Sequence, residues 1–482
     1  MPPTLKPLRP CHILIAGSGI AGLTLALTLE THGIPYTLLE AYPEIIPKSG
    51  AGICLLPNGL RILDQLGCYE DLIERIGGRD ACMQNVYVRD EAGRALHVSD
   101  GWGETMVGRW GYSGLWCDRS TILQTIYDHI VDKWRLLTGK RVASTRHLED
   151  SVEVTTTDGS VYTGDILVGA DGTHSRVREE IVRYANEIGA GEEYDDGDQV
   201  SATYACLFGL STTPSPSTSP SSSTPKSLPK GLLGWNLGHR YSYVLGTGPP
   251  DRTYWLLSIH MGKTYQGTEI PHFTEEDKER IVREHWDDPV TEDLRMRDLY
   301  ESRLHVVVSP LREVVYKRWD CGRMVVLGDA AHKMLPIIAQ GGNQAIETVA
   351  AFTNELVDAL SSPPSSSPSP SPTPLSRPEI TTLLTTLQAT RTARLAAIIE
   401  MGQQRQKMDV LLTPELEKLM LNKFPALMPG VLVKRWDQSL PGAVSLKWLG
   451  RSGRGGVVPY EDEVGEEVGE GRKEWQEGIA KI

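Results

Sequence analysis

The chain has 482 residues, of which 40% are hydrophobic and 23% charged, and its formal net charge is −13 at pH 7. This length predicts more than one lobe, and the composition is that of a soluble globular protein. The negative charge argues against nucleic acid or an anionic membrane as the main partner. The seven cysteines form no CxxC pair. This favours a reducing compartment over a disulfide framework or a metal site, and we expect a cytoplasmic protein.

The uncharged segment 11–29 is long enough to suggest a signal peptide or a membrane anchor. Gly17, Gly19 and Gly22 interrupt it at turn spacing, and we predict a strand, a turn and a helix instead. No other uncharged apolar run approaches the ~20 residues that a membrane span needs. We therefore expect no transmembrane segment, and only peripheral association with a membrane is left open.

The remaining pattern mixes strands and helices. Four short apolar runs predict parallel strands: 11–16, 36–40, 165–170 and 324–329. Residues 241–247 and 253–260 flank a Gly-Pro-Pro-Asp-Arg segment and predict an antiparallel hairpin. From residue 343 to 360, apolar side chains recur at helical spacing, which predicts an amphipathic helix.

Three segments differ in composition from the rest of the chain. Residues 211–230 and 361–378 are almost wholly Ser, Thr and Pro, bury little apolar surface and are predicted to be disordered insertions. Residues 461–470 contain six acids and no base, and we interpret them as a solvated tail.

The first candidate binding motif is the GxGxxG turn formed by Gly17, Gly19 and Gly22. These glycines permit a tight turn, let a pyrophosphate approach the backbone and let the next helix pack closely on the sheet. Glu40 ends the following strand, where a carboxylate accepts hydrogen bonds from the adenosine ribose. The motif predicts a dinucleotide and leaves FAD and NAD as alternatives.

Two further motifs separate these alternatives. Residues 169–178 read Gly-Ala-Asp-Gly-Thr-His-Ser-Arg-Val-Arg, and residues 328–332 read Gly-Asp-Ala-Ala-His, with Gln-Gly-Gly-Asn at 340–343. The three motifs, in this order and spacing, resemble those of the aromatic-hydroxylase-like (class A) FAD monooxygenases. The most similar members are fungal enzymes that oxidise prenylated or polyketide natural products. The resemblance covers roughly residues 10–360.

The resemblance implies roles for matching residues. Glu40 would hold the adenosine ribose, Asp329 the ribityl chain, and Asp171, with Arg178 nearby, would support the pyrophosphate region. The cofactor would also meet Ala51, Cys54, Arg119, Gly341, Gly342 and Asn343, the last two at the pyrimidine edge of the flavin. Cys54 stands where glycine is expected, so we expect it to act through its backbone.

Physical arguments bear on three of these residues. Asn343 opens a predicted helix, whose positive end suits the flavin edge that becomes negative on reduction. Arg119 lies in the first turn of a helix, where a cation is unfavourable unless it faces an anion; pairing with Asp118 is the alternative. For Asp329 the alternative is a plain helix N-cap.

The residues that act on the substrate are less evident. The matching enzymes often place an arginine and a tyrosine over the flavin, but the strand containing residues 204–206 has no arginine. Tyr243 is the candidate catalytic tyrosine, and a core aromatic is an equally good interpretation. Ala339 replaces the usual glycine, and Glu347 or a neighbour replaces the usual Asp. His332 is expected to be structural.

The predicted fold is α/β: a Rossmann-type FAD domain with an inserted mixed or antiparallel β-sheet substrate domain and a helical C-terminal region. The FAD domain would comprise residues 10–180 and 311–360, the substrate domain 181–310, and the C-terminal region, with its acidic tail, 379–482.

The resemblance implies an FAD-dependent monooxygenase. NADPH or NADH would reduce the flavin, and a flavin hydroperoxide formed with molecular oxygen would epoxidise or hydroxylate a hydrophobic secondary-metabolite intermediate. The alternative is a flavin-dependent oxidase or dehydrogenase that drives oxidative cyclisation. No metal is expected, and the sequence leaves substrate identity and oligomeric state open.

Overall fold

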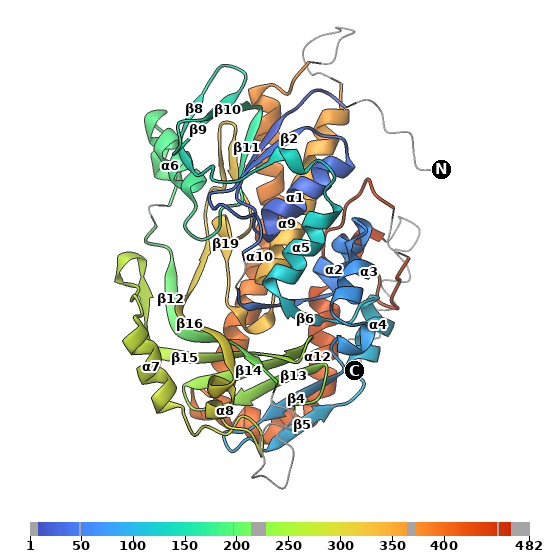
Figure 1. Ribbon diagram of the computed structural model, residues 1–482, viewed down its shortest axis with the longest axis vertical. Coiled ribbons are helices and arrows are strands. Elements are labelled where there is room, and N and C mark those ends of the chain that lie inside the picture. Colours follow the sequence, from blue (N-terminus) through green and yellow to red (C-terminus); the bar gives the residue numbers. More distant parts are fainter. Residues whose placement is uncertain are drawn as a thin grey trace.

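The computed structural model describes residues 8–47, 50–195, 197–213, 228–363, 373–450 and 453–463. A six-stranded sheet contains the four predicted parallel strands in the order β17-β18-β11-β1-β2-β7 (Figure 1). Its strands are β1 (Ile13–Ala16), β2 (Tyr36–Leu39), β7 (Leu136–Leu137), β11 (Ile166–Gly169), β17 (Asp320–Cys321) and β18 (Met324–Val326). All pairs are parallel except β17 with β18, and every residue of β1 is buried, as expected for a strand covered on both faces.

Helices cover this sheet and connect its strands. On one side, α1 (Ile20–Thr31) packs between α5 (Arg119–His129) and α9 (Gly341–Ser361), and α10 (Arg377–Asp409) packs on α9. On the other side lie α6 (Arg176–Glu187) and a small sheet of β8 (Val142–His147), β9 (Val152–Thr156) and β10 (Val161–Gly164) (Figure 1). The amphipathic helix predicted from residue 343 is α9, and it begins two residues earlier. The predicted Rossmann-type domain is confirmed.

A second, eight-stranded sheet lies below the first in Figure 1, in the order β19-β16-β12-β15-β14-β13-β4-β5. Its strands are β4 (Asn85–Arg89), β5 (Ala95–Ser99), β12 (Ser201–Thr212), β13 (Leu232–Leu237), β14 (Tyr241–Gly248), β15 (Arg252–Gln266), β16 (Arg303–Val315) and β19 (His332–Lys333). The predicted hairpin is β14–β15, and β4 pairs parallel with β13, so the sheet is mixed. It extends beyond residues 181–310, because β4, β5 and β19 come from segments assigned to the FAD domain.

The two faces of this sheet have different partners. One face packs on α7 (Glu275–Glu284) and α8 (Met296–Glu301), with Tyr243 and Leu257 in the shared core. The other packs on α12 (Phe424–Ser439) and on the strand pair β3 (Gly52–Leu55) and β6 (Leu115–Asp118), with Val244 and Leu256 in the core. Because side chains alternate along a strand, neighbours such as Tyr243 and Val244 serve opposite faces.

The C-terminal region is helical, as predicted. After α10 come α11 (Pro414–Lys418), a π-helical turn (Leu419–Lys423) and α12. The remaining α-helices of the described chain are α2 (Pro57–Gln65), α3 (Cys68–Arg75) and α4 (Trp102–Trp110). No helix in the described ranges combines the length and apolar character needed to cross a bilayer.

The compositionally unusual segments are only partly described. Residues 214–227, 364–372 and 464–482, which hold most of the two predicted insertions and of the acidic tail, lie outside the described residues. The edges that are described differ from the prediction. Leu375 is buried, Arg377 starts α10, and Asp462 forms an ion pair with Arg61. The first of these edges is attached by the buried Arg9, which donates hydrogen bonds to the carbonyls of Thr373 and Pro374, and the second by the buried Arg61.

Candidate active site

The glycine-rich turn forms one wall of a cavity of about 610 Å³ at the carboxyl ends of β1 and β2. Gly17 adopts a φ of 98°, which favours glycine. A Cβ on Gly22 would lie 1.9 Å from the Gly17 carbonyl oxygen, so only glycine lets α1 start this close to the strand. Gly19 lines the same cavity. The turn thus leaves backbone and helix N-terminus open to a phosphate, as the motif predicts.

Glu40 lies beside this turn, lines the same cavity and is buried. Its Oε2 atom accepts hydrogen bonds from the Ser18 backbone N and hydroxyl, both at 2.7 Å, and its Oε1 atom accepts one from the Tyr42 backbone N at 2.9 Å. These contacts fix the carboxylate and leave Oε1 a free lone pair. A ribose hydroxyl is a suitable donor for it.

A second cavity of about 420 Å³ continues the first. We call the first the adenosine cavity and the second the flavin cavity. The two share Gly19, Arg119, Ala170 and Gly172. The second cavity brings together most of the other predicted cofactor residues: Ala51, Cys54, Asp329, Gly341 and Gly342. The N-terminus of α1, which suits a phosphate, lies where the two cavities meet at Gly19, and the N-terminus of α9, which suits the flavin edge, lines the second cavity through Gly341 and Gly342. The shape and the donors fit an extended FAD molecule.

Arg119 stands at the junction of the two cavities. Among the described residues its guanidinium has no carboxylate partner, because Asp118 instead accepts a hydrogen bond from Tyr254 at 2.8 Å and lies 3.9 Å from Arg252. The alternative pairing of Arg119 with Asp118 is therefore wrong. An unpaired cation at this position suits the pyrophosphate of a dinucleotide.

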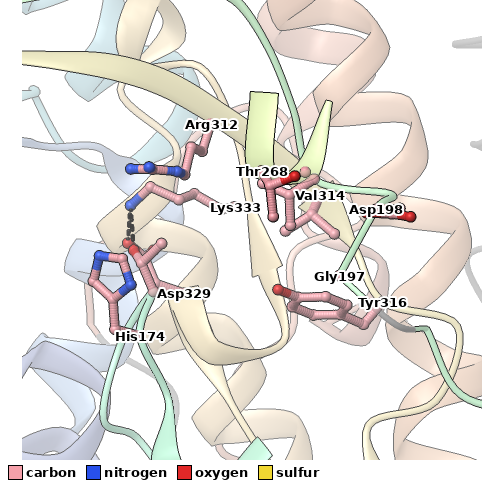
Figure 2. A pocket seen from close by; sticks show the side chains of 12 residues that line it. His174, Gly197, Asp198, Thr268, Arg312, Val314, Tyr316, Asp329 and Lys333 are labelled. Carbon is pink, nitrogen blue, oxygen red and sulfur yellow. Dashed lines mark hydrogen bonds and ion pairs between the residues drawn. The ribbon is translucent and has the colours of Figure 1, made fainter. Parts of the chain in front are cut away.

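Asp329 follows β18 in a 3₁₀ turn and faces a third, smaller cavity of about 230 Å³ (Figure 2). Its carboxylate accepts a hydrogen bond from Lys333 Nζ at 2.5 Å, and Lys333 also donates to Thr173 at 2.8 Å. Figure 2 shows Arg312 and His174 gathered around this pair. Asp329 caps no described helix, so the N-cap alternative is wrong. The carboxylate stays open to the cavity.

Asp171 lines the adenosine cavity but its carboxylate points into the protein. It accepts hydrogen bonds from the Ser175 hydroxyl at 2.5 Å and the Val177 backbone N at 3.1 Å, which fixes the start of α6. Burial raises the pKa of this carboxyl. Arg178 lies over the Tyr316 ring, 3.1 Å from its centroid, and not among the residues lining that cavity. Asp171 thus supports the cavity wall. Arg178 was expected near the pyrophosphate, but it packs on Tyr316 instead.

Asn343 does not face the flavin cavity. Its buried side chain accepts a hydrogen bond from the Leu56 backbone N at 3.0 Å and donates to the carbonyls of Cys54 at 3.1 Å and Ala339 at 2.6 Å. These bonds attach the β3–α2 connection to α9. The helix starts at Gly341, so Gly341 and Gly342 line the cavity in its place.

Tyr243 is not at the site either. It lies on the face of β14 that packs on α7 and α8, and its hydroxyl donates to Asp288 at 2.9 Å. Burial raises the pKa of Tyr243. The core interpretation holds, because Tyr243 does not line the cavities described above, and its neighbour Val244 lines a fourth, mostly apolar cavity on the other face of the sheet. Burial also raises the pKa of the Cys54 thiol, which makes a reactive thiolate there unfavourable.

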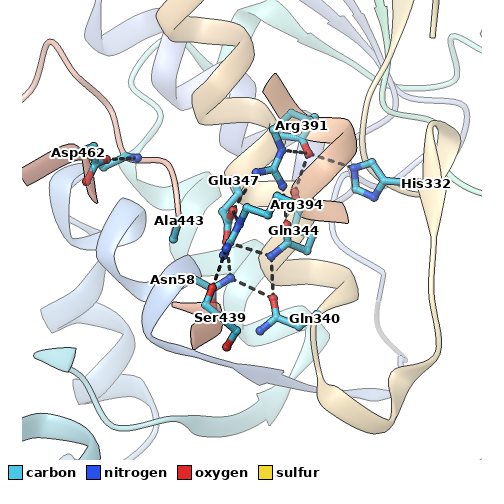
Figure 3. A network of polar contacts seen from close by, with 12 residues as sticks. Asn58, His332, Gln340, Gln344, Glu347, Arg391, Arg394, Ser439, Ala443 and Asp462 are labelled. Atoms are coloured by element: carbon cyan, nitrogen blue, oxygen red, sulfur yellow. Dashed lines mark hydrogen bonds and ion pairs between the residues drawn. The ribbon is translucent and has the colours of Figure 1, made fainter. Parts of the chain in front are cut away.

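A polar network behind the flavin cavity joins α9 to α10 (Figure 3). The fully buried Glu347 accepts hydrogen bonds from Arg391 at 2.9 Å, from Arg394 at 2.6 and 2.8 Å, and from Asn58 at 2.6 Å. Sequence reasoning noted Glu347 but missed both arginines. Their spacing of three residues along a helix was the signal for a shared partner.

Sequence reasoning also missed the fourth cavity, which we call the apolar cavity. It measures about 80 Å³, lies between the eight-stranded sheet and the C-terminal helices, and is mostly apolar. It shares Cys54, Trp116, Pro336 and Ala339 with the flavin cavity. Its other walls come from β13, β14, α10 and α12. Because these elements are distant in sequence, no local motif marks the cavity.

The family model described as "FAD binding domain" matches residues 10–363. FAD-dependent monooxygenase dpchE of Colletotrichum higginsianum is 34% identical over 73% of this chain and 72% of its own length. FAD-dependent monooxygenase anuJ of Penicillium roqueforti is 36% identical over 73% of this chain, but the match spans only 43% of that relative.

Solved structures share the fold. Klebsiella pneumoniae HpxO complexed with FAD and uric acid has a TM-score of 0.67 at 20% identity, covering 90% of this chain and 97% of its own. A salicylate hydroxylase substrate complex has a TM-score of 0.65 at 18% identity, covering 91% and 98%. The matched domain, these relatives and the site geometry agree: the chain belongs to the FAD-dependent monooxygenases, a family of oxidoreductases built on this FAD-binding domain.

Proposed function

We propose that this enzyme, once its FAD is reduced by NADPH or NADH, epoxidises or hydroxylates a hydrophobic secondary-metabolite intermediate. The observation that carries the proposal is the contact between the flavin cavity and the apolar cavity through Cys54, Trp116, Pro336 and Ala339. An apolar substrate held there would lie beside the reactive part of the cofactor. The relatives named as FAD-dependent monooxygenases support the type of reaction.

The chain's residues have separable roles in this proposal. Glu40 binds the adenosine ribose, Arg119 the pyrophosphate and Asp329 the ribityl hydroxyls. Reduced FAD and molecular oxygen together supply an electrophilic oxygen atom. Gly341 and Gly342 place the positive N-terminus of α9 against the flavin edge, where it stabilises negative charge.

The apolar cavity has two roles in this proposal: it positions the substrate, and it excludes water from the reacting atoms. Its lining side chains exclude water, which protects a reactive oxygen species from collapse and strengthens electrostatic interactions nearby. They also hold the reacting carbon of the substrate near the cofactor, which lowers the entropic part of the barrier. Because the chain has one dinucleotide-binding turn, the nicotinamide would bind without a Rossmann unit of its own.

The proposal is tested on the purified protein. Its visible spectrum shows whether FAD is bound, and oxidation of NADPH and NADH is followed with prenylated and phenolic compounds and with mass detection of products. A product heavier by one oxygen atom supports monooxygenation. A product lighter by two hydrogen atoms would instead identify a dehydrogenase. Folded protein that binds no added FAD would contradict the proposal.

A further inference from the structure

The walls of the apolar cavity have an uneven charge distribution. Among its described lining residues the only charged side chains are Arg405 on α10 and Arg435 on α12. The others are mostly aliphatic or aromatic, including Trp235 and Trp436. Both helices lie outside the residues that match the FAD binding domain. This part of the cavity is therefore a property of the C-terminal region of this chain.

Arg405 is buried and only partly satisfied. Its Nε atom donates to Asp409 Oδ2 at 2.9 Å, and its guanidinium lies 4.5 Å from the centroid of the Trp235 ring. Its Nη2 atom is buried and has no hydrogen-bond partner in the part of the chain that the structure describes. A buried donor without a partner costs about 1–3 kcal/mol, more when charged. Buried donors in native proteins nearly always have a hydrogen-bond partner, so this one calls for a bound water, ion or ligand.

Arg435 is a second cation at the same cavity. Within the described ranges its guanidinium forms no hydrogen bond or ion pair, and burial together with Arg405 lowers its pKa. Asp409 is engaged by Arg405, so the two guanidinium groups exceed the nearby carboxylates by one charge. An uncompensated charge in an apolar, half-buried place is unfavourable without an anion.

We infer that this cavity binds a planar oxyanion of the substrate, either a carboxylate or an acidic phenol or enol, between Arg405 and Arg435. The inference deepens the proposed function and rests on it. A guanidinium matches such an oxyanion with two parallel hydrogen bonds. The volume of about 80 Å³ suits a head group, while the apolar body of the substrate extends past Trp116 and Cys54 to the flavin cavity.

The test uses FAD-loaded protein and three probes: 3-prenyl-4-hydroxybenzoate, its methyl ester, and the methyl ester with the phenol also methylated. Binding is measured by the change in the flavin absorption spectrum and by calorimetry. We expect the carboxylate or the phenol to bind at least about tenfold more tightly than the doubly methylated probe, the gain expected from a charged hydrogen bond. The order of the three affinities distinguishes a carboxylate from a phenolate head.

The variant Arg435→Met should reduce this preference to within about twofold and keep FAD bound. Lys434→Met is the matched control, because Lys434 is exposed on the same helix and does not line the cavity. The second arginine is tested with Arg405→Met. If that variant does not fold, Arg405→Lys replaces it, because a lysine keeps a cation for Asp409. Equal affinities for the three probes, no binding of any, or an unchanged preference in Arg435→Met would overturn the inference. Absence of FAD would instead contradict the proposed function.

Discussion

At the scale of single residues, the carboxylates around the cofactor cavity are held in different ways. Glu40 is buried and fixed by three hydrogen bonds. The side chain of Asp329 is 39% exposed, and among the described residues it forms a hydrogen bond with Lys333 alone. Asp171 is turned away and supports the backbone of α6. Removal of Asp329 should therefore affect the ligand more than the fold.

The variant Asp329→Ala should weaken FAD binding by about tenfold or more, because it loses a charged hydrogen bond to the cofactor. The ratio of FAD to protein and a fluorescence titration measure the effect, and thermal unfolding of the FAD-free forms should be unchanged. Asp358→Ala is the control, since Asp358 forms a similarly exposed ion pair with Lys447 away from the cavity. Unaltered FAD affinity in Asp329→Ala would disprove the assigned role.

At the scale of elements, the ion pairs of Glu347 on α9 with Arg391 and Arg394 on α10 keep the start of α9 in place. Burial raises the pKa of the Glu347 carboxyl, but Arg394 and Arg391 lower it more strongly, to about 2. The carboxylate thus stabilises the folded state above its unfolded pKa of about 4.5, and this contribution is lost as the pH falls toward 2. Both arginines donate to this carboxylate, and a second carboxylate, Glu461, lies near Arg394.

The variant Glu347→Gln should lower the free energy of unfolding by about 3–5 kcal/mol at pH 7, because it removes the carboxylate shared by two guanidinium groups and leaves the buried Arg391 without one. The difference from the unmodified protein should shrink as the pH is lowered from 4.5 toward 2. Urea denaturation at several pH values measures both. Glu275→Gln, on a side chain 84% exposed and paired with Lys278, should change stability by less than about 0.5 kcal/mol. A pH-independent difference would refute the role of the Glu347 charge.

At the scale of the whole molecule, the C-terminal helices α10 and α12 form one side of the apolar cavity. Asp437 on α12 is buried and accepts hydrogen bonds from Arg109 Nε and Trp110 Nε1 on α4, both at 3.1 Å. Asp462 pairs with Arg61 on α2. These contacts attach residues 437 and 462 to helices α4 and α2, which precede the eight-stranded sheet's central strands in the sequence. The apolar cavity therefore depends on both halves of the sequence.

The variant Asp437→Ala should loosen α12 and let water reach the cavity while FAD stays bound. We expect NAD(P)H to be consumed with less product and more hydrogen peroxide, since exclusion of water couples the two half-reactions. Product and peroxide are measured per nicotinamide oxidised. Glu400→Ala, on an exposed part of α10, is the control. Full coupling in a folded Asp437→Ala variant would contradict the closing role of α12.

Local sequence signals determined the FAD-binding half. The Gly17–Gly22 turn, Glu40 and the Gly-Asp segment at 328–329 each join a strand end to a helix or turn, and such short motifs specify their own geometry. The same holds for the hairpin β14–β15 and for α9. The predicted fold class and most of the cofactor wall were therefore readable along the chain.

Other features depended on tertiary structure. A single shift along β14 decides whether Tyr243 or Val244 faces the apolar cavity, and only the packing of α7 and α8 settles it. The ion pair of Glu347 with Arg391, and the cavity lined by Arg405 and Arg435, bring together side chains from elements distant in sequence. The sequence by itself determined the family and the cofactor, because these rest on local motifs. The tertiary structure decided which side chains line the apolar cavity, because that depends on the faces that distant elements bury.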